Sequence, residues 1–184
     1  MEATDEQLML AYRAGDAGAF ETLYSRHKGA LYRFILRSVR EPAVAEELFQ
    51  EVWMRVIEAR ARYEPQARFR TWLFTIAQHR MVDRFRRRGL KLVPLDAGDD
   101  PPLDPPARAA DQPERQAETR EQMARLASAL DALPQAQREV FLLREEAGMS
   151  LAEIAQATGT NEEAAKSRLR YALAKLREAI SGHG

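Results

Sequence analysis

An acidic, proline-rich stretch near the middle of the chain limits the possible folds more than any other feature of the sequence. Residues 94–113 hold six of the nine prolines, together with five aspartates and few large apolar side chains. Such a composition cannot bury a core and favours an extended linker. We therefore predict two small domains, over residues 1–92 and 116–182, joined by a flexible acidic linker over residues 93–115. Each domain is short for an independent core, which predicts modest stability or reliance on partners.

Outside the linker, apolar residues recur at three- and four-residue steps, which is the period of an amphipathic helix. Cap and breaker residues such as Asp16, Pro42 and Ser150 stand where these periodic runs begin. No segment alternates apolar and polar residues as a half-buried strand would. The sequence therefore predicts an all-α fold, with helices over residues 17–39, 42–62, 69–88, 114–130, 134–147, 151–158 and 162–180.

The composition excludes several classes of protein. The 28 basic and 28 acidic residues cancel, so the chain is no globally basic nucleic-acid coat, although local basic patches remain open. Without cysteine the chain forms no disulfide, thiolate zinc site or thiol nucleophile, and its three histidines are scattered. We find no paired carboxylates, nucleophile–base pair or glycine-rich phosphate loop. We therefore expect no enzyme, no cofactor and no metal site.

The sequence also lacks the features of a secreted or membrane-embedded protein. Its first ten residues are acidic and have neither the basic start nor the apolar run of a signal peptide. No apolar stretch approaches the roughly 20 residues that a membrane helix needs. We therefore expect the protein in the cytoplasm.

Positive charge is concentrated in two places, although it is balanced over the whole chain. Eight positive residues and one negative residue lie between Arg68 and Lys91, and five positive residues without a negative one lie between Lys166 and Arg177. Arginines mixed with aromatic residues suit unstacked bases, because rings and guanidinium planes stack on bases while cations bind the backbone. The clusters predict nucleic-acid binding in both domains. The alternative is a solvated basic face, and we expect most of the aromatic residues near Arg70 to lie in the core.

Residues 150–176 have the spacing of a helix-turn-helix unit. Ser150 and Glu153 form a predicted capping box at the start of the first helix, and Gly159 provides the turn. Four polar residues project from the first turns of the second helix, where they would reach base edges and phosphates in a major groove. They are Lys166, Ser167, Arg168 and Arg170. The alternative is a plain helical hairpin with a basic face.

Four segments, which include Ala45–Val52, Phe69–Ala77 and Gly148–Ala155, follow one another along the chain. Together they resemble the extracytoplasmic-function (ECF) family of sigma factors, which are subunits of bacterial RNA polymerase. Residues 133–169 resemble sigma region 4, through Leu133-Pro134, Arg138–Arg144, Gly148–Ala155 and Lys166–Leu169. In the N-terminal half, Ala45–Val52 is similar to the family's polymerase-binding segment. Phe69–Ala77, Asp83 and Arg86–Arg88 are similar to its segment for the promoter −10 element, and residues 8–20 also fit. The resemblance covers most of the chain and leaves the acidic linker in the expected place.

The resemblance implies a promoter-specificity subunit that performs no catalytic step. Its first domain would bind core RNA polymerase and melt the −10 element, and its second domain would read the −35 element of promoter DNA as duplex. The residues implied for polymerase binding are Glu46, Glu47, Leu48, Gln50 and Glu51. The resemblance also implies an anti-sigma factor as a partner, commonly a membrane-bound one.

The resemblance also assigns the two DNA contacts. The loop over residues 63–68 would capture a flipped −10 base, with Tyr63 at its rim and His79 facing it from the following helix. The residues implied for the −10 element are Tyr63, Arg68, Arg70, His79, Arg80, Arg84, Arg86, Arg87 and Arg88. Those implied for the −35 element are Glu162, Glu163, Lys166, Ser167, Arg168 and Arg170.

The sequence departs from the family just before Lys166, where Gly-Thr-Val is usual and Asn161–Ala165 stands instead. Glutamates suit the N-terminal end of a helix but disfavour nearby phosphates. Glu162 or Glu163 either accepts a hydrogen bond from a cytosine amino group or serves only as a cap. This departure concerns the −35 preference and leaves the general role unchanged.

Two other functions remain as alternatives. A helical adaptor that binds only protein would have no use for arginine clusters in both domains. A helix-turn-helix repressor or activator with a helical sensor domain would bind duplex DNA by itself, usually as a dimer, without polymerase. Transcription in vitro with core polymerase and this chain distinguishes the three.

Overall fold

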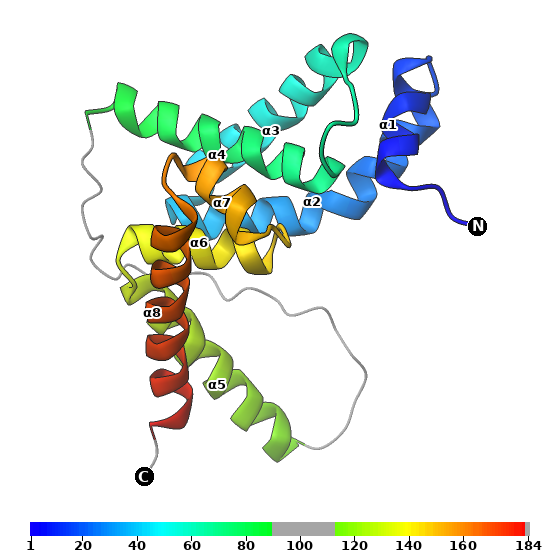
Figure 1. Cartoon of the computed structure of the whole chain (residues 1–184). Helices are drawn as coiled ribbons and strands as arrows, with labels where there is room; N and C mark the ends of the chain where they lie inside the picture. The colour runs from blue at the N-terminus through cyan, green and yellow to red at the C-terminus, as the bar shows by residue number, and fades with distance from the viewer. Residues whose placement is uncertain (90–112, 183–184) are drawn as a thin grey trace.

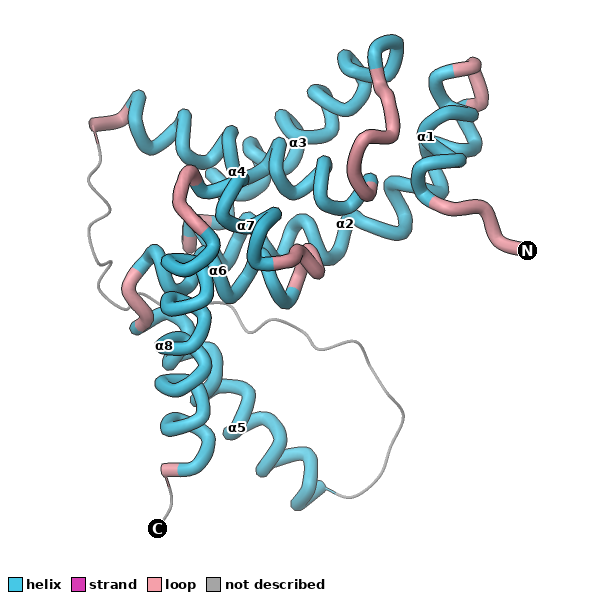
Figure 2. Tube along the Cα trace, viewed as in Figure 1, coloured by secondary structure: helices cyan, strands magenta, loops and turns pink. Residues whose placement is uncertain are grey.

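The computed structural model describes residues 1–89 and 113–182. Within these ranges the chain is helical and forms no strand, which confirms the predicted all-α fold (Figures 1 and 2). The elements are α1 (Asp5–Arg13), α2 (Ala17–Val39), α3 (Pro42–Ala59), the 3-10 turn η1 (Arg60–Arg62), α4 (Phe69–Arg87), α5 (Pro113–Ala132), α6 (Gln135–Glu145), α7 (Leu151–Thr158) and α8 (Glu162–Ser181).

The helices begin at the cap residues that the sequence predicted. The side chain of Asp16 accepts a hydrogen bond from the Ala19 amide at 3.3 Å, and Pro42 is the first residue of α3. Ser150 and Glu153 form the expected capping box of α7. These contacts satisfy amide groups that the first turn of a helix leaves without partners. Side-chain hydrogen bonds therefore fix the starts of α2, α7 and α8, whereas α3, α4 and α6 begin without a capping side chain.

Helix α1 was not predicted. Thr4 and Gln7 form a capping box at its start, the same device that was recognised in α7. Met9 and Tyr12 are buried against the rest of the N-terminal half, and α1 packs mainly on α2. The apolar face of α1 is short and its outer face is strongly polar, so its period is hard to recognise.

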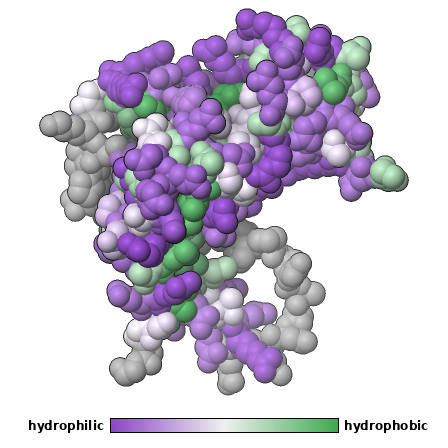
Figure 3. Space-filling model, in the orientation of Figure 1, coloured by the Kyte–Doolittle hydropathy of each residue, from purple (hydrophilic) through white to green (hydrophobic). Residues whose placement is uncertain are grey.

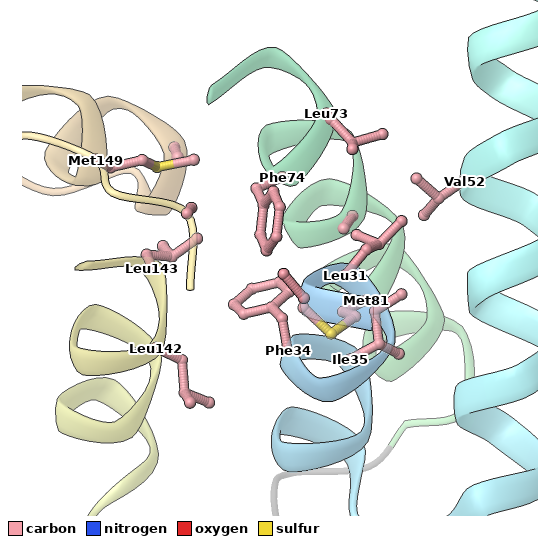
Figure 4. Close-up of a cluster of buried hydrophobic side chains, with 14 of the residues drawn as sticks. Leu31, Phe34, Ile35, Val52, Leu73, Phe74, Met81, Leu142, Leu143 and Met149 are labelled. Atoms are coloured by element: carbon pink, nitrogen blue, oxygen red, sulfur yellow. The ribbon is translucent and has the colours of Figure 1, made fainter. Parts of the chain in front are cut away.

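The N-terminal half (residues 1–89) and the C-terminal half (residues 113–182) of the described chain share buried apolar contacts. Figure 4 shows Phe34 of α2 and Phe74 of α4 facing Leu142 and Leu143 of α6, with Met149 nearby. The rings of Phe34 and Phe74 lie 5.2 Å apart, and both side chains are fully buried. Helix α7 also packs on α4 (Figure 1). In the described residues, the C-terminal half therefore completes the core of the N-terminal half.

Polar contacts reinforce this packing. The Arg70 guanidinium donates to the Glu146 carbonyl, with 2.8 Å from Nε to the oxygen, and Arg68 donates to the Gly148 carbonyl at 2.7 Å. Gln78, which is 2% exposed, donates to Glu139, and burial raises the pKa of that carboxyl group. The turn between α6 and α7 thus lies against the N-terminal part of α4.

Most of the predicted linker lies outside the described residues. Its last residues are helical, because α5 begins at Pro113, one residue before the helix start predicted at 114 and inside the predicted linker. The division into domains over 1–92 and 116–182 stays a prediction. Helices α5 and α8 project together from the body (Figure 1), and Figure 3 shows a largely hydrophilic face with hydrophobic patches beside this pair.

Candidate nucleic-acid and protein interfaces

One side of α3 carries the polar residues that were expected to bind polymerase. Glu46, Glu47 and Gln50 are exposed and Glu51 is half-buried, as their spacing on one helix side requires. We call these four residues the acidic face. Leu48 was expected in the same contact, but its side chain is fully buried and has no surface for a partner. Leu48 lies on the opposite, apolar side of α3, so its role is to pack this helix into the core.

The acidic face is already joined to α4 by ion pairs. The Arg84 guanidinium lies 2.7 Å from the Glu47 carboxylate, and the Arg80 guanidinium lies 3.2 Å from that of Glu51. The arginine side chains are each 18% exposed, whereas the carboxylates keep 63% and 43% of their surface. Residues expected to bind polymerase therefore pair with residues expected to bind DNA. The side chains of Glu46 and Gln50 form no ion pair or hydrogen bond with another described residue.

A hollow lies beside the acidic face. Tyr24, Lys28 and Tyr32 of α2 line it together with Glu46 and Phe49 of α3. Its aromatic rings meet edge to face, with 5.7 Å between the centroids of Tyr32 and Phe49. The surface next to the acidic face is therefore partly apolar, which suits a protein partner.

Tyr63 was expected at the rim of a base pocket, but its side chain is 3% exposed. The ring packs edge to face on Trp72, with 5.0 Å between centroids. Burial, with the negative charges of Glu6 and Asp5 nearby, raises the pKa of Tyr63 to about 12. Tyr63 therefore anchors the start of the loop from inside and offers no ring to a base in this structure. The expected core positions of Phe69 and Phe74 are confirmed, since both are fully buried.

We call residues 63–68 the base-capture loop, after its predicted role. Its residues from Glu64 to Arg68 are exposed, and His79 is exposed on α4. Arg68 also lies 3.3 Å from the Glu153 carboxylate, in addition to its bond with the Gly148 carbonyl. Arg68 and Arg70, both expected on the −10 element, are thus bound by the C-terminal half in this arrangement.

Helix α4 ends in exposed arginines that remain available. Arg86, Arg87 and Arg88 are exposed, and none of them forms an ion pair with another described residue. Three adjacent guanidinium groups attract polyanions and pair well with phosphate oxygens. We call this group the arginine end.

The predicted helix-turn-helix unit is formed by α7 and α8. Gly159 has φ of 67°, a left-handed conformation that favours glycine, and Asn161 caps α8. Ile154 of α7 and Ala165 of α8 are fully buried in the core that this unit joins. The small side chain of Ala165 permits the helices to approach closely.

The first turns of α8 hold the residues that were expected to contact the −35 element. Lys166 and Arg170 are exposed. Glu162 and Glu163 are exposed too, and they lie at the N-terminal end of α8, where the helix dipole favours negative charge. Ser167 and Arg168 are half-buried. Two carboxylates at the start of α8 are therefore followed by cations within the next two turns, and Glu162, Glu163, Lys166 and Arg170 are exposed to solvent.

Sequence reasoning missed the polar residues of α1. Asp5 lies 2.6 Å from Nε2 of His27, and burial lowers the pKa of that histidine. The carboxylate of Glu6 accepts a hydrogen bond from the Phe69 amide at 2.7 Å, and Arg13 donates to the Tyr63 carbonyl at 3.0 Å. The only available signal was the Thr4–Gln7 spacing.

In the part of the chain that the structure describes, no group of histidine, aspartate or glutamate side chains could hold a metal ion. Within the same ranges, no helix has the length and apolar character needed to cross a membrane.

Comparison with protein families and curated proteins finds sigma factors. Residues 23–90 match the family described as Sigma-70 region 2, and residues 123–176 match the family described as Sigma-70, region 4. The chain is 34% identical over 172 residues to the RNA polymerase sigma factor CarQ of Myxococcus xanthus, an alignment that covers 94% of this chain and 95% of CarQ. It is 32% identical over 167 residues to the ECF RNA polymerase sigma factor SigK of Mycolicibacterium vanbaalenii, covering 90% of this chain and 83% of that protein.

Solved structures of two sigma factors share the arrangement of helices. The structure of CnrH in complex with the cytosolic domain of CnrY has a TM-score of 0.65 and 26% identity, covering 98% of this chain and 99% of CnrH. The sigma factor RpoE of Bartonella quintana, in complex with the anti-sigma factor NepR, has a TM-score of 0.66 and 23% identity, covering 88% and 96% of the two chains. At that identity the second likeness concerns the fold alone.

Proposed function

The chain belongs to the extracytoplasmic-function family of sigma-70 factors, which direct RNA polymerase to promoters, and we propose that its two halves divide promoter recognition between them. The arginine end and the base-capture loop would bind the −10 element, while the first turns of α8 would read the −35 element. The observation that carries this division is the exposure of two cationic groups on separate helices, Arg86–Arg88 on α4 and Lys166 with Arg170 on α8. We place this activity in the cytoplasm, where transcription occurs.

The two groups differ in what they can recognise. The arginine end holds three adjacent cations, which suit phosphates and carry no sequence information. Helix α8 mixes Glu162 and Glu163 with Lys166, so it offers both an acceptor and a donor to base edges. Salt should therefore weaken the first contact more than the second, and base changes should affect mainly the second.

We expect Arg87→Ala to weaken open-complex formation on all cognate promoters alike. It should also reduce the slope of the logarithm of affinity against the logarithm of salt concentration by about one unit. Glu163→Ala and Lys166→Ala should instead change the ranking of −35 variants, at about 1–3 kcal/mol for the affected base pair. The measurement is transcription by the reconstituted polymerase from a library randomised at −35, at two salt concentrations. Glu178→Ala, an exposed glutamate later in α8, is the matched control. If Arg87→Ala altered the ranking of −35 variants and the two α8 variants did not, the roles assigned to the two cationic groups would be wrong.

We also propose that the acidic face and the neighbouring hollow bind core polymerase. Carboxylates at the rim of an interface orient a basic partner and accelerate association, while apolar rings supply buried contact area. Glu46 and Gln50 are the sharpest probes, because Glu47 and Glu51 also hold Arg84 and Arg80. Leu48 is no longer part of this proposal.

We therefore expect Glu46→Arg combined with Gln50→Ala to lower the affinity for core polymerase by about thirtyfold, since each of the two disturbed contacts contributes on the order of 1 kcal/mol. Helicity should stay unchanged because both side chains are exposed. Competition with a labelled sigma factor for core enzyme measures the effect, and Glu178→Arg provides the same charge reversal elsewhere. Equal competition by the variant and the wild-type chain would show that this face is only solvated.

We propose an anti-sigma factor as a further partner. The support is the likeness to CnrH, whose structure was solved with the cytosolic domain of CnrY. Pull-down from the source cell with the full chain, followed by loss of transcription on adding the captured protein, tests this proposal.

A repressor or activator that binds duplex DNA alone is the second candidate function, because α7 and α8 form a complete helix-turn-helix unit. Transcription from genomic promoters with core polymerase, with and without this chain, separates the two. Initiation that depends on the chain supports the sigma factor. Sequence-specific binding without any effect on initiation supports the alternative.

A further inference from the structure

Helix α1 precedes the segment that matches sigma region 2, which begins at residue 23. It nevertheless contacts the base-capture loop at both ends. Arg13 donates to the Tyr63 carbonyl at 3.0 Å, where the loop begins, and Glu6 accepts from the Phe69 amide at 2.7 Å, where the loop passes into α4. The Arg60 guanidinium also lies over the Tyr12 ring, 5.0 Å from its centroid, just before the loop.

The Glu6 contact replaces a missing cap. Arg68 stands at the N-cap position of α4 and its side chain forms no capping hydrogen bond. The first amides of a helix have no partner within the helix, and its N-terminal end favours a negative charge. Glu6 supplies both the acceptor and the charge from another helix. It thereby fixes the point at which the loop ends and α4 begins.

The Arg13 contact fixes the other end. Tyr63 is held from within the core by its ring, and Arg13 holds its carbonyl from outside. Between these two anchors, residues 64–68 are exposed. A short exposed segment with both ends fixed keeps the geometry that selective binding requires.

Other contacts attach α1 to α2. Met9 and Tyr12 bury the apolar side of α1, and Asp5 pairs with His27 and Arg26 of α2. Because these contacts hold α1 on α2 independently, removing Glu6 or Arg13 should release the loop while leaving the helix in place.

We infer that Glu6 and Arg13 are positioning residues for capture of the −10 base, acting through the loop without touching DNA. This inference rests on the proposed role of residues 63–68. Extruding a base from the stack is costly, and the contacts that compensate it must be in place when the base arrives. A loosened loop would bind the correct and the incorrect base with more similar affinity.

The test measures selectivity at −10 separately from selectivity at −35. Polymerase reconstituted with Glu6→Ala, Glu6→Gln, Arg13→Ala or the wild-type chain transcribes two libraries, one randomised at each element. In parallel, 2-aminopurine placed at each −10 position reports extrusion of the base by its fluorescence. Glu2→Ala is the matched control, because Glu2 pairs with Arg26 and has no contact with the loop.

We expect Glu6→Ala and Arg13→Ala to reduce discrimination at −10 by about fivefold, the equivalent of one lost capping contact. The −35 ranking, the affinity for core polymerase and the helicity should stay unchanged. Glu6→Gln should restore most of the discrimination, since its amide oxygen can still accept from the Phe69 amide. The fluorescence increase at the captured position should fall in the two alanine variants only.

Other outcomes would overturn the inference. An unchanged −10 ranking in Arg13→Ala, whose side chain is exposed, would do so even if Glu6→Ala failed to fold. An equal loss on all promoters, or at −35 as well, would show a purely structural role. Failure of the wild-type chain to direct any transcription would instead refute the proposed function, so the two failures are distinct.

Discussion

Phe74→Ala is expected to lower the free energy of unfolding by about 3–5 kcal/mol, the range for removing a fully buried ring. Phe74 lies where α2, α4 and α6 meet, so the cavity would open between the two halves of the chain (Figure 4). The Arg70 guanidinium, 5.6 Å from the centre of the ring, would lose a cation–π contact as well. Urea unfolding followed by circular dichroism measures the change.

The matched control is Tyr171→Ala, which removes a ring of similar size that is 54% exposed on α8. Its expected effect is below about 0.5 kcal/mol, as for other surface substitutions. If the halves share a core, Phe74→Ala should also make the C-terminal half more susceptible to limited proteolysis. A loss under about 1 kcal/mol would mean that the ring is not packed as described.

The second large effect concerns polymerase. The free chain is expected to bind promoter duplex weakly, and core enzyme should increase specific affinity by about a thousandfold, within the range that separates specific from non-specific binding. Positions −35 and −10 are numbered about 25 base pairs apart, which is roughly 85 Å of duplex at 3.4 Å per base pair. The two halves contact each other through Arg68 and Gly148, and the same contact occupies an arginine expected on the −10 element. We therefore expect the halves to separate when both elements are bound.

Fluorescence anisotropy with a labelled promoter, with and without core enzyme, measures this dependence. A promoter with both elements scrambled is the control for non-specific binding. Nanomolar, sequence-specific binding by the free chain would refute the expectation and favour a repressor. Energy transfer between dyes attached at residues 21 and 178, both exposed, should fall when core enzyme is added.

The sequence predicted most of the helices, because their ends depend on local chemistry. Pro42, Ser150 and Gly159 act within a turn of the backbone that they affect, so their roles can be recognised without the rest of the fold. Helix α1 was missed because its short apolar face gives a weak period. Its anchoring depends on partners such as His27, 22 residues further along the chain.

The candidate site was less predictable than the helices. The family resemblance assigned Leu48 to polymerase binding together with its acidic neighbours, but the side chain of Leu48 is fully buried in the core. The family resemblance implied that Tyr63 stands at the rim of a base pocket, but its ring is buried against Trp72. The contacts of Glu6 and Arg13 join residues far apart in sequence, so a local sequence pattern could not predict them.

The ion pairs between α3 and α4 have a consequence for how the two ligands of the chain affect each other. A polymerase cation that binds Glu47 or Glu51 competes with Arg84 or Arg80, and a released guanidinium becomes available to phosphate. Thermodynamic linkage makes this effect reciprocal, so DNA bound to the arginines would equally free the carboxylates for polymerase. If Glu47 binds polymerase and Arg84 binds DNA as proposed, a variant at Glu47 would change two equilibria at once, and its affinity for polymerase would have a defined value only at a stated concentration of promoter.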